Sequence, residues 1–368
     1  MPITLLSELG LFVVYLRRCI GNRTCVTPPL RSRDDKVRYA RNMPPINTLL
    51  CWAISDTAAG NVRQARALAD AIGQTTRRDV AVRVRQPWDA LAPHLTAGAR
   101  SAIRDSAGQS LAPPWPDIAI GCGRRAALLT RLLRRWSGGS TFTVQILDPR
   151  IDPSAFDMVI APQHDGVDAS NVIRSIGALN PVDAHWLADA RTRFARLAAL
   201  PSPRTAVLIG ATNRAQRLDG RYFDALLDRL RAERAADGGS FLVSVSRRTP
   251  SDVVSRLRAA FAAFPSSFWA EERDGENPYA GFLAWSDRIV VTPDSVNMLS
   301  EACATGKPAY TFAPQPIAGK LAAFHHALRE SGHLRVLGES APNPLPPPLA
   351  ETREIAALVR ARWLAASR

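Results

Sequence analysis

The sequence lacks most of the signatures that would place it in a common enzyme or membrane class. It contains no Walker motif, no GxSxG, no HExxH and no repeat at a solenoid period, which argues against a P-loop NTPase, an α/β hydrolase and a zinc protease. No apolar run approaches the roughly 18–20 residues that a membrane-spanning helix needs. Hydrophobic residues make up 46% of the chain and charged residues 22%, which is too apolar for disorder and typical of a globular protein.

Cysteine is scarce and scattered. The five cysteines form no CxxC pair and no Cys/His cluster, so the sequence predicts neither a disulfide framework nor a metal site. Such usage is typical of a reducing compartment, and we expect a cytoplasmic protein. These residues are Cys19, Cys25, Cys51, Cys122 and Cys303.

Acidic residues are fewer than basic ones. The chain contains 33 Asp and Glu and 47 Lys and Arg, which gives a formal net charge of +14. The excess has three possible readings: a solvated arginine-rich surface, a weak contact with anionic lipid at the inner face of the cytoplasmic membrane, or a contact with an acidic acceptor. No basic stripe is interleaved with aromatic residues, so we expect no nucleic-acid partner.

Residues 1–44 differ from the rest. They carry eight basic and three acidic side chains, and their single apolar stretch, residues 9–16, is too short for an anchor and is followed rather than preceded by Arg17 and Arg18. Met43 stands just before the first convincing strand. We therefore expect a disordered extension, or residues translated because an upstream start was chosen.

From residue 45 to residue 200, short apolar runs alternate with amphipathic helices. This order is typical of a parallel, doubly wound sheet. Strands are predicted at residues 49–54, 80–84, 117–120, 142–147 and 158–161. Helices are predicted after the first strand, ending at Gly73, and after the third, through Trp136.

The same alternation restarts over residues 204–342. A helix at 187–200 precedes Pro201-Ser202-Pro203, which we interpret as a hinge. Strands follow at 206–210, 241–246, 288–292 and 309–312, and Thr249-Pro250 is expected to cap a helix. Residues 343–368 are a Pro-rich linker and a final helix from about Glu351. The sequence thus predicts an α/β fold of two Rossmann-like lobes facing a cleft, with ligands at the carboxyl ends of the strands.

The segment from Val290 to Pro308 carries the strongest chemical signal. A strand ends and small polar residues enter a helix, whose free N–H groups form an anion site. Asp294 or Ser295 can cap this helix, and Ser295 can also donate to a phosphate. Glu301 lies two turns in, where its carboxylate can accept two ribose hydroxyls. The alternative is an ordinary capped helix with Glu301 on its solvated side.

This segment, from Asp294 through Ser300-Glu301 to Gly306-Lys307-Pro308, resembles the mitochondrial-fission ELM family of plants and bacteria, which is glycosyltransferase-like. The likeness runs from about residue 49 to residue 314. Other matching segments are Ile54-Ser55-Asp56 with Gly60 and Gln64, Gly123-Arg124-Arg125, Val144-Gln145-Ile146, Asp148-Pro149-Arg150, Ala161-Pro162 with His164-Asp165, Ile209-Gly210, and Gly275-Glu276-Asn277-Pro278-Tyr279.

More distantly, the Ser300-Glu301…Gly306 pattern is similar to the donor half of GT-B glycosyltransferases, in which the matching Glu holds a nucleotide ribose. The resemblance implies a nucleoside-diphosphate sugar as donor substrate, no required cofactor or metal, and helix dipoles that neutralise the leaving diphosphate. It also implies an acceptor that is a cell-envelope saccharide or a lipid-linked one.

Three further groups complete the predicted sites. Gly210, Thr212 and Arg214 follow the first strand of the second lobe, and Arg247 follows the next, so all four are candidate donor contacts unless they form ordinary polar loops. A general base must take the proton of the acceptor hydroxyl. Asp56 is the first candidate for this role and His164 the second, although Asp56 can also be a helix cap. Gly60 and Asn61 lie on the same acceptor-side loop, and Gly123, Arg124, Arg125 and Asp148 are further acceptor-side candidates.

Two rival functions remain. Gly121-Cys122-Gly123 with Ala126 fits a dinucleotide fingerprint, and Asp148 ends the following strand, which would suit an NAD-dependent epimerase or oxidoreductase. The fingerprint is preceded by two strands rather than opening the fold, and Arg124 and Arg125 can instead hold an acceptor phosphate. The other rival is a non-catalytic adaptor or membrane-division factor that keeps the fold without turnover.

Overall fold

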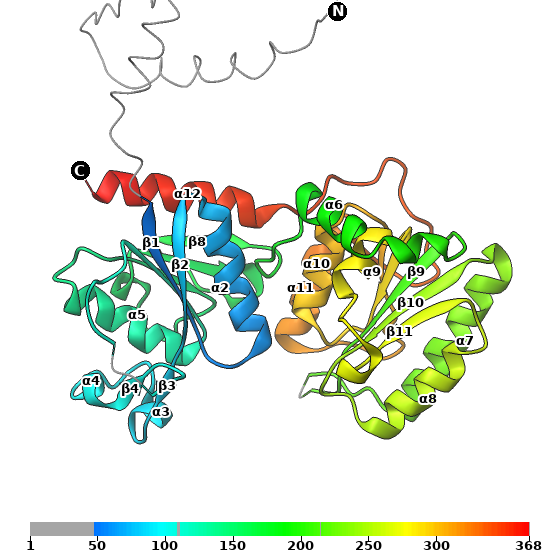
Figure 1. Ribbon diagram of the computed structural model, residues 1–368, viewed down its shortest axis with the longest axis horizontal. Helices are drawn as coiled ribbons and strands as arrows, with labels where there is room; N and C mark the ends of the chain where they lie inside the picture. Colours follow the sequence, from blue (N-terminus) through cyan, green and yellow to red (C-terminus); the bar gives the residue numbers. More distant parts are fainter. Residues whose placement is uncertain (1–47, 109–110, 214, 368) are drawn as a thin grey trace, which may run out of the picture. The chain divides into compact units, whose positions relative to one another are not determined.

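The computed structural model describes residues 48–108, 111–213 and 215–367. The predicted extension over residues 1–44 and the candidate donor contact Arg214 lie outside these ranges. From Thr48 onward the chain forms one compact unit, which contains two six-stranded parallel sheets with helices on both faces (Figure 1). The predicted α/β class with two Rossmann-like lobes is confirmed.

The first sheet has the strand order β2-β1-β5-β6-β7-β8. Its strands are β1 (Leu49–Ser55), β2 (Thr75–Ala81), β5 (Ile118–Cys122), β6 (Phe142–Ile146), β7 (Met158–Pro162) and β8 (Val172–Ser175). Its helices are α2 (Ala59–Ile72), α5 (Arg124–Trp136) and the chain's last helix, α12 (Glu351–Ala366), with 3-10 turns at Pro153–Ala155 and η3 (Gln163–Asp165).

Alternation along β1 divides the first core into two layers. Cys51 and Ala53 face α2 and α12, whereas Trp52 and Ile54 face α5. Both layers are apolar because successive side chains of a strand point to opposite faces and helices cover both. Helix α2 ends where Gly73 adopts a φ of 70°, a left-handed stop that the sequence predicted.

The second sheet has the order β11-β10-β9-β12-β13-β14. Its strands are β9 (Arg204–Ile209), β10 (Ser240–Val245), β11 (Ser266–Trp269), β12 (Arg288–Val291), β13 (Ala309–Thr311) and β14 (Leu334–Val336). Helices α7 (Gly220–Asp237) and α8 (Ser251–Phe261) cover one face. Helices α6 (Ala184–Arg193), α9 (Tyr279–Trp285), α10 (Val296–Ala304) and α11 (Gly319–Glu330) lie on the other, with 3-10 turns η4 (Ala195–Ala199) and Glu272–Asp274.

Several local predictions are wrong. Strands β8, β11 and β14 were not predicted. All three are short and contain polar residues, so none has a long apolar run. The strand predicted at 80–84 begins at Thr75 and ends at Ala81, and Arg83–Val84 (β3) instead pairs antiparallel with β4 (Ile103–Arg104). Thr249 does not cap α8, because its hydroxyl donates to the carbonyl of Gly210.

The chain crosses between the lobes twice. It leaves β8 and passes through residues 176–182 to α6, which packs on α9, and η4 adds Leu197 to the second core. It returns after β14 to α12, which packs on α2 (Figure 1). Glu351 joins the two crossings, since its carboxylate accepts from the N–H groups of Ile176 at 2.6 Å and Gly177 at 2.8 Å.

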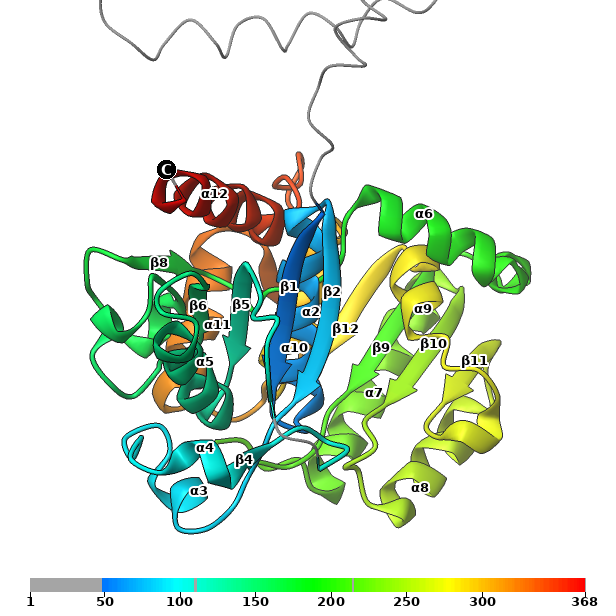
Figure 2. The ribbon, with the colours of Figure 1, turned by 60° about the vertical axis from the view of Figure 1, so that its left-hand side comes forward.

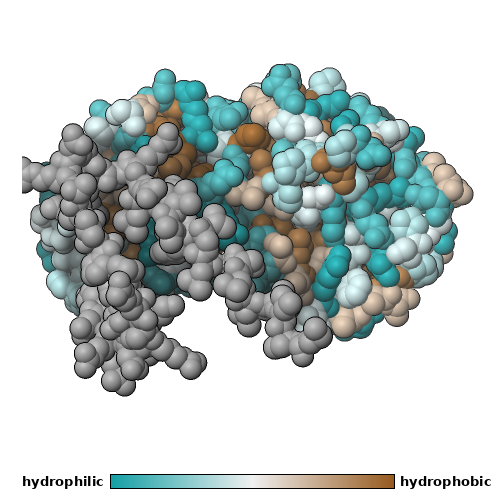
Figure 3. All heavy atoms as spheres, turned by 90° about the horizontal axis from the view of Figure 1, so that it is seen from above, coloured by the Kyte–Doolittle hydropathy of each residue, from teal (hydrophilic) through white to brown (hydrophobic). Residues whose placement is uncertain are grey.

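One face of the molecule illustrates the character of the surface. On the face shown in Figure 3, hydrophilic side chains predominate and hydrophobic ones form small groups. Within the described residues, no helix is both long and apolar enough to cross a membrane.

Candidate functional site

Each sheet has one point at which its strand order reverses. In the first sheet this point lies between β1 and β5, and in the second between β9 and β12 (Figure 2). Loops diverge there at the carboxyl ends of the strands and leave room for a ligand. Most residues predicted for the donor and acceptor sites follow these four strands, whereas Arg247 follows β10, Asp148 follows β6 and His164 follows β7.

In the second lobe, Asp294 organises the reversal point. Its carboxylate accepts from the Ala211 N–H at 3.0 Å and from the Thr292 hydroxyl at 2.6 Å, and the Thr292 hydroxyl accepts from the Gly210 N–H at 2.8 Å. A side chain on Gly210 would overlap the Asp294 carboxylate. Burial raises the pKa of Asp294, and the bonds from Thr292 and Ala211 partly offset the rise.

Helix α10 begins directly after this loop. Of the two predicted caps, Ser295 is the one that caps it, because its side chain accepts from the Met298 N–H, whereas Asp294 turns back to the β9 loop. The first turn of α10 meets the first lobe, since Gln64 donates to the side chain of Asn297 at 3.4 Å. Gly60 allows this approach, because a side chain there would overlap Asn297.

Glu301 is buried at the boundary between the lobes, with 1% of its side chain exposed. The alternative that placed it on the solvated side of α10 is therefore wrong. Arg63 of α2 lies with its Nε 2.7 Å from Oε1, and Tyr279 donates its hydroxyl to Oε2. The Arg63 contact lacks hydrogen-bond geometry, so Oε1 remains a buried acceptor without a donor. Burial raises the pKa of Glu301, and Arg63 and Tyr279 counteract the rise.

Ser300 faces the crossing rather than a ligand space. Its hydroxyl accepts from the Ala178 N–H at 2.8 Å and donates to the Val296 carbonyl at 2.8 Å. Of the other predicted donor contacts, Thr212 exchanges hydrogen bonds with the backbone of Leu218.

In the first lobe, Asp56 and Asn61 lie beside Gly123 at the reversal point. Oδ1 of Asp56 accepts from the Ala58 N–H and from Asn61 Nδ2, both at 3.0 Å. Its Oδ2 has no hydrogen-bond partner among the described residues and points toward Gly123. Asp56 is not the capping residue of α2, since that position belongs to Ala58.

Three predicted acceptor-side residues have protein partners. Arg124 and Arg125 both bond the carboxylate of Asp89, at 3.2 Å and 2.6 Å, and these contacts hold the pKa of Asp89 below its usual range. Asp148 accepts from the Arg150 N–H at 2.8 Å in its own loop.

His164 takes part in a contact between the lobes. Its ring packs edge-on against Phe324 of α11, with 5.4 Å between ring centroids, and the adjacent Asp165 pairs with Lys320 at 2.7 Å. Burial lowers the pKa of His164, so its ring is neutral near pH 7.

A pocket of about 520 Å³ opens beside α2 and reaches the turn after β10, a size that suits a small ligand. Sequence analysis predicted Arg247 as a donor contact but missed the α2 side of this pocket. The available signal was the spacing of Arg63, Arg66 and Asp70, which places them on one face of a helix. The pocket is lined by Thr57, Ala59, Val62, Arg63, Arg66, Ala67, Asp70, Arg77, Pro181 and Arg247.

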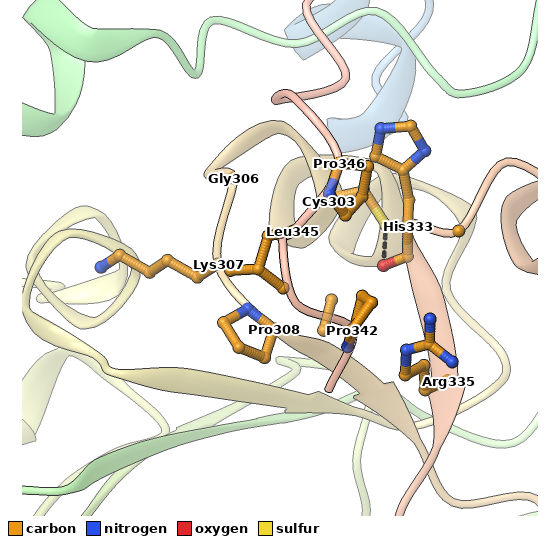
Figure 4. Close-up of a pocket in the computed structure, with 11 residues that line it drawn as sticks. Cys303, Gly306, Lys307, Pro308, His333, Arg335, Pro342, Leu345 and Pro346 are labelled. Atoms are coloured by element: carbon orange, nitrogen blue, oxygen red, sulfur yellow. Dashed lines mark hydrogen bonds between the residues drawn. The ribbon is translucent and has the colours of Figure 1, made fainter. Parts of the chain in front are cut away.

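A second hollow, beneath the Pro-rich segment, is much smaller. It lies between Cys303, His333 and Arg335, and Lys307 points away from it (Figure 4). Its volume of about 10 Å³ is that of a single water site. Lys307 instead donates to the carbonyls of Leu283 and Ala284, and burial lowers its pKa to about 8. Within the described part of the chain, no three His, Cys, Asp or Glu side chains are grouped closely enough to hold a metal ion.

Comparison with known proteins identifies the family. The profile described as "Mitochondrial fission ELM1" matches residues 59–363. The chain belongs to the mitochondrial fission ELM1 family. Its ELM1 relative in Arabidopsis thaliana, named mitochondrial fission protein ELM1, is 32% identical over 292 residues, which cover 72% of this chain and 67% of the relative. Another relative, the uncharacterized protein RP120 of Rickettsia prowazekii, is 28% identical over 304 residues, and this alignment covers 72% of this chain and 83% of the relative.

Solved structures resemble this ELM1-family chain only distantly. MurG of Acinetobacter baumannii is 15% identical, covers 86% of this chain and 94% of its own, and superposes with a TM-score of 0.43. A glycosyltransferase from Rickettsia africae is 11% identical, covers 87% and 94%, and superposes with a TM-score of 0.41. At such low identities and TM-scores, the activity and substrate of these structures cannot be assigned to the ELM1-family chain.

Proposed function

We propose that this protein binds a nucleoside-diphosphate sugar between its lobes and transfers the sugar to a cell-envelope or lipid-linked acceptor. The observation that supports this function best is the buried Oε1 of Glu301, which has no hydrogen-bond donor and lies 2.7 Å from Nε of Arg63, a residue that lines the arginine-lined pocket. Buried polar atoms without partners are rare in proteins. A ribose supplies paired O–H donors of the kind that such a carboxylate accepts.

The pocket has the charge that a diphosphate needs. Arg66 and Arg77 line it but are neutralised by ion pairs with Asp70 and Asp79. Arg247 is exposed, and among the described residues no carboxylate lies within ion-pair distance of it. A guanidinium matches a phosphate with two parallel N–H donors, so Arg247 is the proposed primary diphosphate contact. Arg247 and the positive dipole end of α10 would together neutralise the leaving diphosphate without a metal.

Donor binding would exchange one contact of Glu301 for another. Arg63 has 39% of its side chain exposed, so it can turn from Glu301 toward the diphosphate while ribose hydroxyls take its place. The ribose hydroxyls would then supply hydrogen bonds to the buried carboxylate, which matters because a buried carboxylate oxygen without a donor is costly.

Asp56 is the proposed general base. Its Oδ1 is fixed by two donors while Oδ2 has none, which leaves one oxygen to receive a proton from an acceptor hydroxyl. His164 is the second choice, because its neutral ring can accept a proton but packs against Phe324.

One observation favours a second candidate, the non-catalytic adaptor or membrane-division factor. Arg63 of the first lobe pairs with Glu301 of the second and so joins the lobes, while Tyr279 of the second lobe binds the other oxygen of Glu301. The Arabidopsis relative is named for mitochondrial fission, not for a reaction. An adaptor would keep this contact permanently as part of its fold.

Thermal unfolding with UDP, GDP, ADP, CMP and NAD separates these functions. A ligand at 100 times its Kd should stabilise the protein by about 2.7 kcal/mol, a shift of a few degrees. We expect one nucleoside diphosphate to stabilise the wild type and the control Arg221→Ala, but not Arg247→Ala. Stabilisation by NAD alone would move the site to the Gly121 turn, and no shift with any ligand would favour the adaptor.

Turnover needs its own measurement, since binding does not establish an enzyme. Release of the nucleoside diphosphate from its sugar conjugate should fall about 10²–10⁴-fold in Asp56→Asn, the usual contribution of a general base, with the ligand-induced thermal shift retained. Equal rates in wild type and Asp56→Asn would remove Asp56 from the reaction.

A further inference from the structure

One segment of the first lobe is rich in arginine and poor in acidic residues. The basic hairpin, defined here as residues 82–104, comprises β3, the short helices α3 (Trp88–Leu91) and α4 (Ala99–Ala102), and β4. It holds four arginines, Arg83, Arg85, Arg100 and Arg104, and a single acidic residue, Asp89. In Figure 2 it projects beyond the arrowheads of β1 and β2, at the carboxyl edge of the first sheet.

The inner side of the basic hairpin is anchored to the lobe. Val82, Ala92, Ala99 and Ile103 belong to the core layer that packs on α5. Asp89 also faces inward, because both of its oxygens are bound by Arg124 and Arg125 at the start of α5. The negative charge of Asp89 is therefore used inside the lobe and does not neutralise the outer face.

On the outer face, arginines face one another. Arg83 and Arg104 are direct cross-strand partners in the β3–β4 pair, which brings their Cβ atoms to roughly 5 Å. Like charges at such a position are destabilising unless anions lie between them. The side chains of Arg83, Arg85 and Arg100 are exposed, and none of the three forms an ion pair with a carboxylate of the described residues.

Apolar groups accompany these charges. Leu91 is 49% exposed. It follows Asp89 by two residues in a single helical turn, so it points away from the inward-facing Asp89. A segment that combines exposed arginines with an exposed apolar side chain is typical of surfaces that bind the boundary between headgroups and acyl chains.

We propose that the basic hairpin docks on a bilayer that contains anionic lipids. Nucleic acid is the obvious alternative for an arginine-rich surface, but single strands bind through open aromatic faces. Trp136 is covered by Arg100, whose guanidinium lies 5.2 Å from the ring centroid, and Trp88 is half-buried. The large hydrophobic side chains that are exposed in the described residues are all leucines.

This inference does not depend on the proposed enzymatic function. Docking through the basic hairpin would turn the carboxyl edge of the first sheet, with Asp56, toward the bilayer. A lipid-linked acceptor would then reach the acceptor-side loop without leaving the membrane.

Co-sedimentation of the full chain with vesicles tests the inference. We compare phosphatidylcholine vesicles with vesicles that also contain about 30% phosphatidylglycerol, since anionic lipid supplies the attraction. Wild type should bind only the anionic vesicles and should dissociate at high salt. In Arg83→Ala/Arg85→Ala/Arg104→Ala the partition coefficient should fall on the order of 100-fold, because each arginine near such a surface contributes about fivefold.

The matched control is Arg196→Ala/Arg221→Ala/Arg353→Ala, which removes the same charge from three other exposed positions and should bind nearly as wild type does. A second variant, Leu91→Ser, keeps every arginine and should weaken binding by a smaller factor. Equal losses in the two triple variants, or equal binding to neutral vesicles, would overturn the proposal. Displacement of wild type from anionic vesicles by a stoichiometric amount of RNA would assign the basic hairpin to nucleic acid instead.

Discussion

The contact between Arg63 and Glu301 makes a quantitative prediction about stability. Substitution of Arg63 by Met keeps much of the aliphatic stem but leaves the carboxylate of Glu301, which is 1% exposed, with Tyr279 as its only described donor. Removing one partner of a fully buried ion pair costs about 3–5 kcal/mol. Because 39% of the Arg63 side chain is exposed, solvent screens the pair, and we expect a loss of about 1–3 kcal/mol at pH 8.

The loss should depend on pH with a definite sign. Burial raises the pKa of Glu301, and Arg63 counteracts the rise, so Arg63→Met should raise that pKa further. A carboxyl group with a raised folded-state pKa stabilises the fold most below its unfolded pKa, and this contribution is lost as the pH rises through the folded pKa. The penalty of Arg63→Met should therefore be largest at pH 8 and should shrink as the pH is lowered toward 5.

Urea unfolding of the wild type, Arg63→Met, Glu301→Gln and the double variant between pH 5 and pH 8 measures these terms. Arg66→Met is the matched control, because Arg66 lies on the same helix but pairs with Asp79, which is 38% exposed, and should cost no more than about 1 kcal/mol. The reasoning is refuted if the Arg63→Met penalty is the same at both pH values, or is no smaller in the Glu301→Gln background.

Three further substitutions probe the loops and the crossing. Gly210→Ala should cost about 1–3 kcal/mol by urea unfolding, because its Cβ would overlap the Asp294 carboxylate. The control Gly220→Ala should be tolerated, since a Cβ there meets only the flexible Arg256 guanidinium at 3.2 Å. Equal losses of stability in the two variants would contradict this reasoning. Burial raises the pKa of Asp294, so the wild type should lose stability relative to Asp294→Asn as the pH rises from 4 to 8, and a difference independent of pH would disprove it. Glu351→Gln should cost about 1–3 kcal/mol, because an amide has one acceptor oxygen for the two N–H groups of Ile176 and Gly177. Hydrogen exchange of these two amides should accelerate in the variant. Unchanged exchange would show that the Glu351 carboxylate does not hold this segment.

The central strands and their helices were predictable from the sequence because each signal is local. Strand β5, for example, is a short apolar run that is buried on both faces. Strand β2 was placed too late because an edge strand can be polar: Arg77, Arg78 and Asp79 are exposed within it. The same reason explains why β8 and β11 escaped prediction.

The predicted site residues show where sequence reasoning ends. Glu301 could be singled out because it follows a strand and a small-residue helix start, but its neighbour Arg63 comes from the other lobe and has no local signal. Arg124 and Arg125 look free in the sequence, whereas the fold brings Asp89 to them from the basic hairpin. Partners that are distant along the chain decide which charges remain available, and the pattern of one segment does not reveal them.

The return of the chain to its first lobe has a consequence for synthesis. Ile355, Ala356 and Val359 of α12 are part of the same core layer as Cys51 and Ala53 of β1. The first lobe therefore cannot complete its core until α12 has been made, whereas the second lobe has all its strands by Val336. Domains usually fold in the order in which they are made. In this protein the first lobe is completed after the second, so a released chain truncated before residue 351 should carry a folded second lobe and an incomplete first one.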